Sequence, residues 1–445
     1  MLSLRWWEKL WRVIPTEVIF VLRRLQEHGY EAYLVGGAPR DLLLSKLPTD
    51  WDLSTNAPPE RIKEIFAQTI PVGEKFGTVL VVINDFSLEV TTFRREGTYT
   101  DGRHPDWVDF TTSLLADLSR RDFTINAMAI DPLSRKIIDP FGGRRDLKRR
   151  LIRTVGDPRL RFQEDALRML RFFRFQSTLG FRGERRTEEG INPLEIRKIS
   201  GERIGEELKK LLISAFPEKG LTGMARTSLL TTIIPEFIPV LQDGNRLFQH
   251  LVATTQAIKP LPELRWAAFL HDLGKGSTRI QVGEEIHYYG HDKVGQELAT
   301  GILERIRYAN SFSKNVSTLI RWHMFSTDPL VSDAALRRLV IRVGREYIKD
   351  LLELRRADIV GTGGAYHLAL KGLSAFASRI EALLTGETVF SIRDLAINGH
   401  DVMELLSLPP GPKVGEVLQE VFRWVIEDPK RNQRERLLYY LEKNY

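Results

Sequence analysis

The pattern of apolar and polar positions changes along the chain near residue 145. Before that point, short apolar runs are bounded by polar and glycine-containing segments, and residues 15–30 have the spacing of a helix. The runs AYLVGG, DWDLSTN at 50–56, TVLVVI and SLEVTTF predict four strands, with the last two joined near Asn84 and Asp85. After residue 145, apolar residues recur at intervals of three and four, which predicts helices almost throughout. The sequence therefore predicts an α+β fold, with a small mixed sheet in an N-terminal head and an all-helical remainder.

Composition narrows the chemistry that the chain can carry out. Its 445 residues include no cysteine, so disulfides and cysteine nucleophiles are excluded and any metal must be held by His, Asp or Glu. The net charge of +7 fits a polyanionic partner. No apolar run is long enough to span a bilayer, and the charged opening segment with three tryptophans predicts an amphipathic helix packed on the protein. We expect a cytoplasmic protein with no membrane partner.

The most informative stretch is GGAPRDLLLSKLPTDWDLST. Asp50 and Asp52 are two residues apart, so an extended strand would project both carboxylates from one face, where they repel unless a cation lies between them. Such a pair suits magnesium-dependent phosphoryl transfer. Gly36 and Gly37 let the backbone approach a triphosphate, and Arg40 can meet its charge. Asp-x-Asp and a double glycine each also occur in ordinary loops, so the prediction depends on their combination.

Several further blocks follow in a fixed order: TIPVGEKFGTVLVV, EVTTFRREGTYTDGRHPDWVDF at 89–110, RRDFTINAMA at 120–129, IIDPFGG at 137–143 and RFQEDALRMLRFFRF at 161–175. Across residues 33–212, the series resembles the polymerase-beta-like nucleotidyltransferases, in particular the class II tRNA nucleotidyltransferases (CCA-adding enzymes) and bacterial poly(A) polymerases. The resemblance implies a head at residues 1–150 and a neck with a nucleotide-selecting helix at 151–215. It also implies a helical body at 216–385 and a tRNA-binding tail at 386–445.

The resemblance assigns roles to the head residues. Asp50 and Asp52 are implied to hold two catalytic Mg²⁺ ions. Glu89 lies where this superfamily often places a third catalytic carboxylate, although an ion pair with a nearby arginine is an alternative. Asp122 is implied to accept a ribose hydroxyl proton and Arg121 to pair with phosphate, while a helix cap is the alternative for Asp122. The implied nucleotide-binding set also includes Gly36, Gly37, Arg40 and Asn126.

Four charged residues then follow at intervals of three: Asp165, Arg168, Arg171 and Arg174. In one helix they would form a slanting row, and a solvent-exposed charge stripe is the ordinary explanation. In the resembled family this block binds the nucleotide, and Asp165 and Arg168 are implied to read the base edge of CTP or ATP. Uracil and guanine would be rejected because buried polar groups would stay unpaired.

Two features predict a tRNA partner. From residue 144 to 174, eleven Lys or Arg stand against four Asp or Glu, and we expect this ridge to face the acceptor stem, although a solvated basic helix would look the same. The C-terminal AINGHDVMELLSLPPGPKVGEV resembles the tail that holds the tRNA elbow.

The segment that contains Arg94, Asp101, Arg103 and Pro105 resembles a loop of CCA-adding enzymes. Those enzymes use the loop to switch from C to A addition, and CC-only enzymes lack it.

A second metal site is predicted in the helical half. FLHDLGKG places His271 beside Asp272, and His250 lies upstream. This pattern resembles the HD phosphohydrolase superfamily, here at about residues 245–360, in which a distant aspartate completes a divalent metal site, and Asp358 is the candidate. HD folds also persist as inactive scaffolds. The residues that would add a second ion or bind phosphate are His291 and His323.

The sequence therefore predicts a CCA-adding enzyme that transfers nucleotides from CTP and ATP to the tRNA 3′ end and releases pyrophosphate. One alternative is an A-adding tRNA nucleotidyltransferase that works with a separate CC-adding enzyme. Another is an HD metal-dependent phosphohydrolase whose head only binds RNA. A poly(A) polymerase would instead extend generic RNA by many adenylates.

Overall fold

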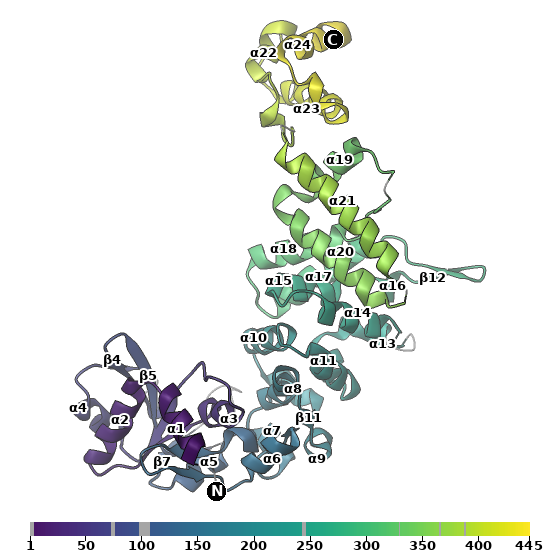
Figure 1. Ribbon diagram of the computed structural model, residues 1–445. Helices are drawn as coiled ribbons and strands as arrows, with labels where there is room; N and C mark the ends of the chain where they lie inside the picture. Colours follow the sequence, from purple (N-terminus) through teal and green to yellow (C-terminus); the bar gives the residue numbers. More distant parts are fainter. Residues whose placement is uncertain are drawn as a thin grey trace. The chain divides into compact units, whose positions relative to one another are not determined.

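The structure is a computed structural model that describes residues 4–72, 76–97, 107–242, 246–328, 330–364, 366–386 and 389–445. The chain divides into two compact units, Met1–Pro235 and Glu236–Tyr445 (Figure 1). The predicted α+β class is confirmed, because the main sheet lies in the first unit and helices dominate the second. The finer division into head, neck, body and tail stays a prediction.

A mixed sheet organises the first unit. Its strand order is β3-β4-β5-β2-β1-β8-β9, in which β2 runs parallel to β5 and the other neighbours are antiparallel. Asn84, with a φ of 54°, makes the tight turn between β4 and β5, as the sequence predicts. The strands are β1 (Ala32–Val35), β2 (Asp52–Thr55), β3 (Thr69–Pro71), β4 (Thr78–Ile83), β5 (Phe86–Thr92), β8 (Ala129–Asp131) and β9 (Lys136–Ile138).

One sequence-based expectation for this sheet needs correction, and three strands were not predicted. The second strand begins at Asp52 instead of residue 50, so Asp50 lies just before it. The strands β3, β8 and β9 were not predicted, because each is three residues long and too short to show an alternating pattern. Short pairings outside the main sheet join β6 (Arg94–Glu96) to β7 (Val108–Phe110) and β10 (Leu151–Ile152) to β11 (Arg182–Gly183).

The two faces of the sheet have different partners. On one face, the predicted amphipathic helix α1 (Leu4–Val13) buries Trp7 in a core with Val18 of α2 (Thr16–Glu27) and with Leu34 and Leu53 of the sheet. On the other face, Val35 packs against Leu114 of α5 (Leu114–Ser119). Asp52 pairs with Val35 in the β1–β2 register, so its side chain lies on this second face.

The remaining helices of the first unit are mostly short. They are α3 (Gly37–Leu43), α4 (Pro59–Ile65), α6 (Gly143–Arg149), α7 (Pro158–Glu164), α8 (Leu167–Leu179), α9 (Arg185–Glu189), α10 (Gly201–Leu212), α11 (Pro217–Arg226) and α12 (Leu229–Ile233). Helix α8 packs against α10 and α11. Its Met169, Leu170 and Phe173 are fully buried, so α8 is a central helix of this part of the unit.

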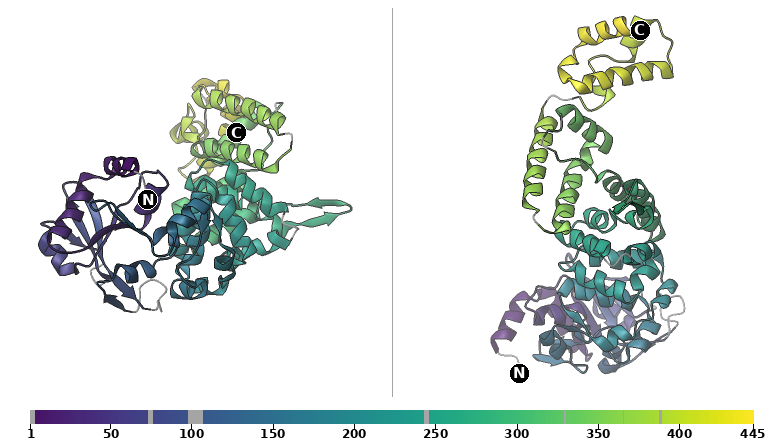
Figure 2. Two further views of the ribbon diagram at one scale, coloured as in Figure 1. Left: turned by 60° about the horizontal axis from the view of Figure 1, so that its bottom comes forward. Right: turned by 90° about the vertical axis from the view of Figure 1, so that its right-hand side faces the viewer.

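Among the residues of the second unit that the structure describes, one hairpin departs from the helical pattern. The hairpin of β12 (Ile280–Val282) and β13 (Glu285–His287) projects from its helices (Figures 1 and 2) and was not predicted. The helices are α13 (Ile238–Gln242), α14 (Arg246–Ala257), α15 (Pro262–Leu270), α16 (Lys275–Thr278), α17 (His291–Arg305), α18 (Asn310–Trp322), α19 (Asp333–Val343), α20 (Ile348–Thr362), α21 (His367–Thr385), α22 (Gly399–Leu406), α23 (Pro412–Glu427) and α24 (Arg434–Asn444).

The last three helices share a core of their own. Val402 of α22, Val417 of α23 and Leu437 of α24 are fully buried in it, and Figure 2 shows these helices as a compact yellow group. Among the helices that the structure describes, none is long and apolar enough to cross a bilayer.

Candidate active site

The acidic pair and the glycine turn meet at the ends of β1 and β2. Gly36 has a φ of 70°, and a Cβ at this position would lie 2.9 Å from Oδ2 of Asp52. A side chain on residue 36 would therefore collide with the carboxylate. The turn brings the N-terminus of α3, where Gly37 lies, beside Asp52. This arrangement places backbone N–H groups and a carboxylate at one point, as a metal-bound triphosphate would require.

The charges of Asp50 and Glu89 act on Asp52, although the three carboxylates do not form a closed group. Burial and the charge of Glu89, with a smaller contribution from Asp50, raise the pKa of Asp52, although Arg121 opposes this. Asp50 is exposed and precedes the strand, which corrects the expectation that both aspartates lie in one strand. The oxygens of Asp50, Asp52 and Glu89 do not all lie within 4.8 Å of one another. A carboxylate under the negative charge of two others fits a divalent cation, because the cation would relieve their repulsion.

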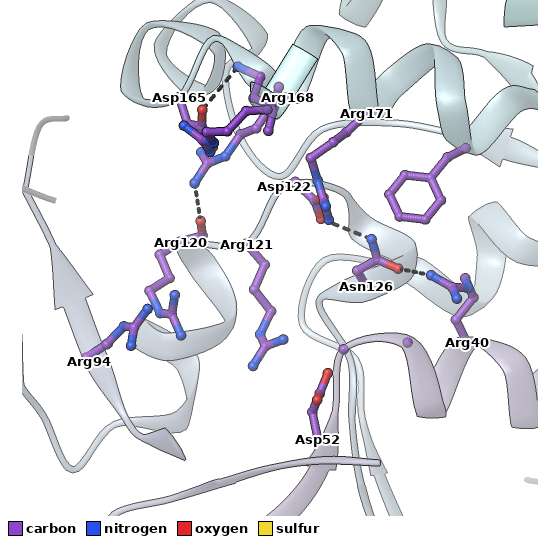
Figure 3. A pocket seen from close by; sticks show the side chains of 15 residues that line it. Arg40, Asp52, Arg94, Arg120, Arg121, Asp122, Asn126, Asp165, Arg168 and Arg171 are labelled. Carbon is purple, nitrogen blue, oxygen red and sulfur yellow. Dashed lines mark hydrogen bonds and ion pairs between the residues drawn. The ribbon is translucent and has the colours of Figure 1, made fainter. Parts of the chain in front are cut away.

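A pocket of about 370 Å³ opens above Asp52 (Figure 3). Its lining has seven arginines and three aspartates, an excess of positive charge that suits a triphosphate. The structure brings together nine of the ten residues predicted to bind nucleotide. These are Gly36, Gly37, Arg40, Arg121, Asp122, Asn126, Asp165, Arg168 and Arg171.

The remaining predicted residue, Arg174, lies outside the lining. Its Nε donates to Glu207 at 2.6 Å, and its guanidinium lies 4.1 Å from the ring centre of Phe175. Burial lowers the pKa of Arg174, against the opposing effect of Glu207. Arg174 therefore contacts Phe175, a pocket-lining residue, and its predicted direct contact with nucleotide stays untested.

Asp122 is the centre of a buried polar network. Its Oδ2 accepts from Nε and Nη2 of Arg171 at 2.8 and 2.6 Å, and its Oδ1 accepts from Asn126 at 3.0 Å. Asn126 in turn accepts from Arg40 at 2.8 Å. Burial alone would raise the pKa of Asp122, but Arg171 and Asn126 outweigh it and lower that pKa to about 2. Asp122 is therefore an ionised acceptor at neutral pH, as a ribose hydroxyl would need.

Arg121 reaches toward Asp52 from the opposite wall (Figure 3). Its Nη2 donates to Asp117 at 3.2 Å and to Ser54 at 3.3 Å. Asp117 is fully buried. Burial raises its pKa, but Arg120 and Arg121 lower that pKa by more than burial raises it, so Asp117 stays charged. This partner fixes Arg121 beside the Asp52 carboxylate.

The predicted base-reading pair does not lie in one continuous helix. Asp165 separates α7 from α8 and has an extended backbone, with φ of −144° and ψ of 104°. Its Oδ1 accepts from the backbone N–H of Leu167 at 3.0 Å, and its Oδ2 lies 3.4 Å from Arg203. The row expected at intervals of three is thus broken at its first member. Asp165 nevertheless lines the same pocket as Arg168.

Arg168 is buried and oriented by three oxygens. Its Nη1 donates to Glu164 at 2.6 Å and to the carbonyl of Arg161 at 3.2 Å, and its Nη2 donates to the carbonyl of Arg120 at 3.0 Å. It is only 7% exposed, which contradicts the ordinary explanation of a solvated charge stripe. The carboxylate and backbone carbonyls hold its guanidinium in one orientation.

Five lining residues were not assigned to the site from the sequence: Arg94, Arg120, Leu167, Phe175 and Arg203. All but Arg203 lie in or beside motifs that the sequence analysis quotes, so position within a motif was the available signal. Arg203 lies on α10, 38 positions after Asp165, and only the packing of α10 against α8 brings it to the pocket. The loop residues Asp101, Arg103 and Pro105 lie outside the described residues.

Gly36→Ala is expected to slow nucleotide addition about tenfold or more, because the new Cβ would displace the Asp52 carboxylate. The matched control is Gly29→Ala. Gly29 has a φ of 83°, and a Cβ added there would meet nothing within 4 Å, so this variant also carries the cost of a side chain at positive φ without touching the site. Single-turnover rates and melting temperatures separate the two effects. Equal losses of rate in both variants would show that Gly36 matters only for the backbone.

A second group of titratable residues lies within the helical unit. The predicted ligands come together from three separate helical segments: His250 on α14, His271 and Asp272 at the end of α15, and Asp358 on α20. The Nε2 of His250 lies 3.2 Å from Oδ1 of Asp358 and 3.2 Å from Nε2 of His271. These groups fit a divalent ion that accepts nitrogen and oxygen ligands.

Two further histidines reach the same place. Nε2 of His291, the first residue of α17, lies 3.5 Å from Oδ1 of Asp272, and Nε2 of His323, which follows α18, lies 3.4 Å from it. Burial lowers the pKa of His291, which favours its neutral form. His400 and Asp401 instead belong to a helix start, where Asp401 accepts from the backbone of Asn398.

Three family models match parts of the chain. The "Poly A polymerase head domain" matches residues 32–153, and the "Probable RNA and SrmB-binding site of polymerase A" matches residues 180–241. The "tRNA nucleotidyltransferase domain 2 putative" matches residues 292–441. The mixed sheet, its Asp52 site and these matches define the class of the protein, which is a nucleotidyltransferase with a polymerase-type head.

Relatives that match nearly the whole chain narrow the class to one family. The CCA-adding enzyme of Geobacillus stearothermophilus is 36% identical over 428 residues, covering 96% of each chain, and that of Streptococcus gordonii is 35% identical over 434 residues, with the same coverage. A crystal structure of the Bacillus stearothermophilus CCA-adding enzyme in complex with CTP has a TM-score of 0.73, at 33% identity and 96% coverage of both chains. The chain belongs to the family of CCA-adding enzymes, the template-independent tRNA nucleotidyltransferases, which depend on divalent metal ions.

Proposed function

We propose that Asp50 and Asp52, with Glu89 as a third carboxylate, hold two Mg²⁺ ions, and that the pocket above them binds CTP or ATP. The observation that carries this proposal is the contact between the glycine turn and Asp52 at the edge of an arginine-lined pocket. Ions held by these carboxylates would supply activation of the tRNA 3′-hydroxyl and neutralisation of the departing pyrophosphate. A set of carboxylate ligands suits a hard cation such as Mg²⁺.

The residues of the chain contribute positioning and charge. The N–H groups of the glycine turn and Arg121 face the triphosphate, while Arg40 is held by both oxygens of Asp41 and by Asn126. The ionised Asp122 accepts the ribose hydroxyl, which selects ribonucleotides. These groups are fixed before the nucleotide arrives, so binding does not have to order them.

Base selection is assigned to Asp165 and Arg168. A carboxylate accepts from the exocyclic amino group that cytosine and adenine share, and a guanidinium donates to their ring acceptors. Uracil and guanine present a carbonyl in place of that amino group, so they would leave the carboxylate unpaired. The hydrogen bonds that fix Arg168 support this role, because a template must keep one orientation.

The tRNA is proposed to lie against α6. Of the eleven basic residues from 144 to 174, five are consecutive or nearly so and exposed: Arg144, Arg145, Lys148, Arg149 and Arg150. The other six lie outside α6, and among them only Arg159 is exposed. A patch of exposed cations on one short helix suits a phosphate backbone and predicts salt-sensitive binding.

The test is the pattern of products on truncated tRNAs. A tRNA that lacks its terminal CCA, incubated with CTP and ATP, is expected to gain two C residues and one A, and CTP alone is expected to give only the two C residues. An enzyme that adds A only to a tRNA already ending in CC would contradict the proposal and indicate an A-adding enzyme. Many adenylates on unrelated RNA would indicate a poly(A) polymerase.

A further inference from the structure

The ring of Phe175 lies among three guanidinium groups. The guanidinium carbon of Arg174 is 4.1 Å from the centre of the ring, that of Arg40 is 5.3 Å from it and that of Arg171 is 5.4 Å from it. All three distances fall within the range of about 6 Å over which the negative face of an aromatic ring attracts a cation. One ring is therefore the common neighbour of three like charges.

The three arginines reach this ring from two different elements. Arg40 belongs to α3, which follows the glycine turn, whereas Arg171 and Arg174 lie on α8, the helix that carries Phe175. Arg40 and Arg171 line the nucleotide pocket together with Phe175 (Figure 3), and Arg174 lies outside the lining. The ring is thus in contact with arginines on two sides of the pocket.

Phe175 is buried, although its neighbours are not those of an ordinary core residue. Its side chain is only 4% exposed, and it packs against Phe123 with 5.6 Å between the ring centres and an angle of 80° between the planes. This contact anchors the ring in the core, while the guanidiniums make its other contacts charged. Attraction between a cation and a ring is stronger where water is excluded than on an open surface.

Contact with a ring leaves the hydrogen-bond donors of an arginine available. A guanidinium that stacks on an aromatic ring keeps its five N–H groups, because all of them lie in its plane. Arg40 uses three of these groups, in bonds to both oxygens of Asp41 and to Asn126, so two remain for a phosphate. Arg171 likewise donates through Nε and Nη2 to Asp122 and keeps the N–H groups of Nη1 for a ligand.

An aromatic ring also meets a requirement that a further carboxylate could not meet. Positive charges gathered for a triphosphate repel one another while the pocket is empty. Burial lowers the pKa of Arg174, and the positive charge of Arg171 adds to this effect, although Glu207 opposes both. Another acidic side chain would relieve the repulsion but would also repel the nucleotide. A ring attracts each guanidinium and adds no net negative charge.

We propose that Phe175 is a positioning residue, which holds Arg40 and Arg171 toward the triphosphate of the bound nucleotide through cation–π contacts. This inference rests on the proposed binding of CTP or ATP in the pocket. Phe175 acts on the phosphate end of the nucleotide, whereas Asp165 and Arg168 are assigned to the base. Weakening the ring's attraction therefore weakens the binding of all four nucleotides and of inorganic pyrophosphate alike, and it leaves the base preference unchanged.

Phenylalanines that carry none, one, two or three ring fluorines, placed at position 175 of the full-length protein, test this inference. Fluorine withdraws electrons from the ring and weakens its attraction for cations in steps, while the shape of the ring changes little. The dissociation constant of CTP, measured by titration without tRNA, is expected to rise with each fluorine and to be about tenfold higher for the trifluorinated ring. The dissociation constant of pyrophosphate should rise by the same factor. Constants that stay level across the series would overturn the proposal.

The matched control is the same series at Phe123. This ring is also fully buried, and it packs against Phe172 and Phe175 with ring centres 6.1 and 5.6 Å away. Fluorine at Phe123 changes contacts between rings, so it is expected to alter the melting temperature at most and to leave both dissociation constants at their wild-type values. Equal rises in the two series would show that only ring packing matters, and the proposed role of Phe175 would be wrong.

Phe175→Leu gives a second measurement with a standard amino acid. Leucine keeps the position apolar but has no ring to attract a cation. The KM values for CTP and ATP are expected to rise about tenfold, with kcat much less affected and with the ratio of kcat/KM between CTP and UTP unchanged. A merely structural role would lower kcat with the melting temperature and leave KM as it is. A change in the ratio would assign Phe175 to base selection and contradict the proposal.

Arg40→Gln separates this inference from the proposed function on which it rests. Removal of this charge is expected to weaken CTP and pyrophosphate at least as much as the trifluorinated ring at Phe175 does. If Arg40→Gln binds both ligands as the wild type does, the pocket is not the triphosphate site, and the proposed function fails together with this inference. If Arg40→Gln weakens both ligands while the fluorine series stays level, only the role of Phe175 is wrong.

Discussion

Asp52→Asn is expected to lower the rate of nucleotide addition about 1,000-fold or more, because a neutral amide replaces the carboxylate that meets the glycine turn. The melting temperature should stay the same or rise. Burial and Glu89 already raise the pKa of Asp52, so its charge is unfavourable when no metal is bound. A large loss of rate without a loss of stability would identify a residue kept for catalysis. The measurements are single-turnover addition of C to a tRNA that lacks CCA, and thermal unfolding.

The control for this experiment is Asp85→Asn, which removes the same charge from the exposed turn between β4 and β5. It should change neither the rate nor tRNA binding. The assignment of Asp52 would be wrong if Asp52→Asn retained more than about a tenth of the wild-type rate, since loss of a metal ligand costs several kcal/mol of transition-state stabilisation.

Arg168→Ala is expected to lower kcat/KM for CTP and ATP about 100-fold and to weaken their preference over UTP and GTP. The variant removes the guanidinium that Glu164 and the carbonyl of Arg120 hold in place for the base edge. The ratio of kcat/KM between CTP and UTP is the decisive measurement. A purely structural arginine would lower all four values together and leave that ratio unchanged.

Arg159→Ala is the matched variant for this second experiment. Arg159 lies on α7 and is exposed, outside the pocket lining. It should keep the wild-type preference among the four nucleotides. Its exposed position suits a contact with tRNA phosphates, so a modest, salt-dependent loss of tRNA affinity is compatible with this variant. If Arg159→Ala relaxed the preference as much as Arg168→Ala, the pocket would not be the site of base selection.

The sequence predicted the centre of the sheet because local chemistry determined it. The runs that became β1, β4 and β5 are long enough to show apolar patterning, and Gly36 and Asn84 mark turns that need unusual backbone angles. The strands that were missed are three residues long, and one of them, β8, pairs with β1, which lies far away in the sequence. Such strands leave no periodic signal of their own.

The nucleotide pocket was predictable as a set of residues, but not in its geometry. Regular spacing suggested one helix from Asp165 to Arg174, yet the chain turns at Asp165, whose carboxylate bonds the first N–H group of α8. An aspartate that competes for backbone hydrogen bonds ends one helix and begins the next. Arg203 was missed because helix packing alone brings it near.

In the helical unit as well, the sequence indicated residues of the site but not how the fold brings them together. His250, His271, Asp272 and Asp358 were assigned to one site by their resemblance to the HD superfamily, because the distance from His250 to Asp358 along the chain does not by itself indicate that they meet. Only the packing of α14 against α20 places their side chains 3.2 Å apart. The hairpin between Asp272 and His291 was not predicted, since its three-residue strands lie in a segment otherwise read as helical.

The nucleotide pocket lies where two parts of the first unit are held together by hydrogen bonds. On one wall are Asp122 and the carbonyl of Arg120, and on the other are Arg171 and Arg168 of α8, tied across by hydrogen bonds of 2.6 to 3.0 Å. A nucleotide that contacts both walls would stabilise their association, so its binding would raise the melting temperature of the protein. A ligand at a hundred times its Kd adds about 2.7 kcal/mol to the free energy of unfolding. Cellular CTP and ATP would then stabilise the folded protein as well as serve as its substrates.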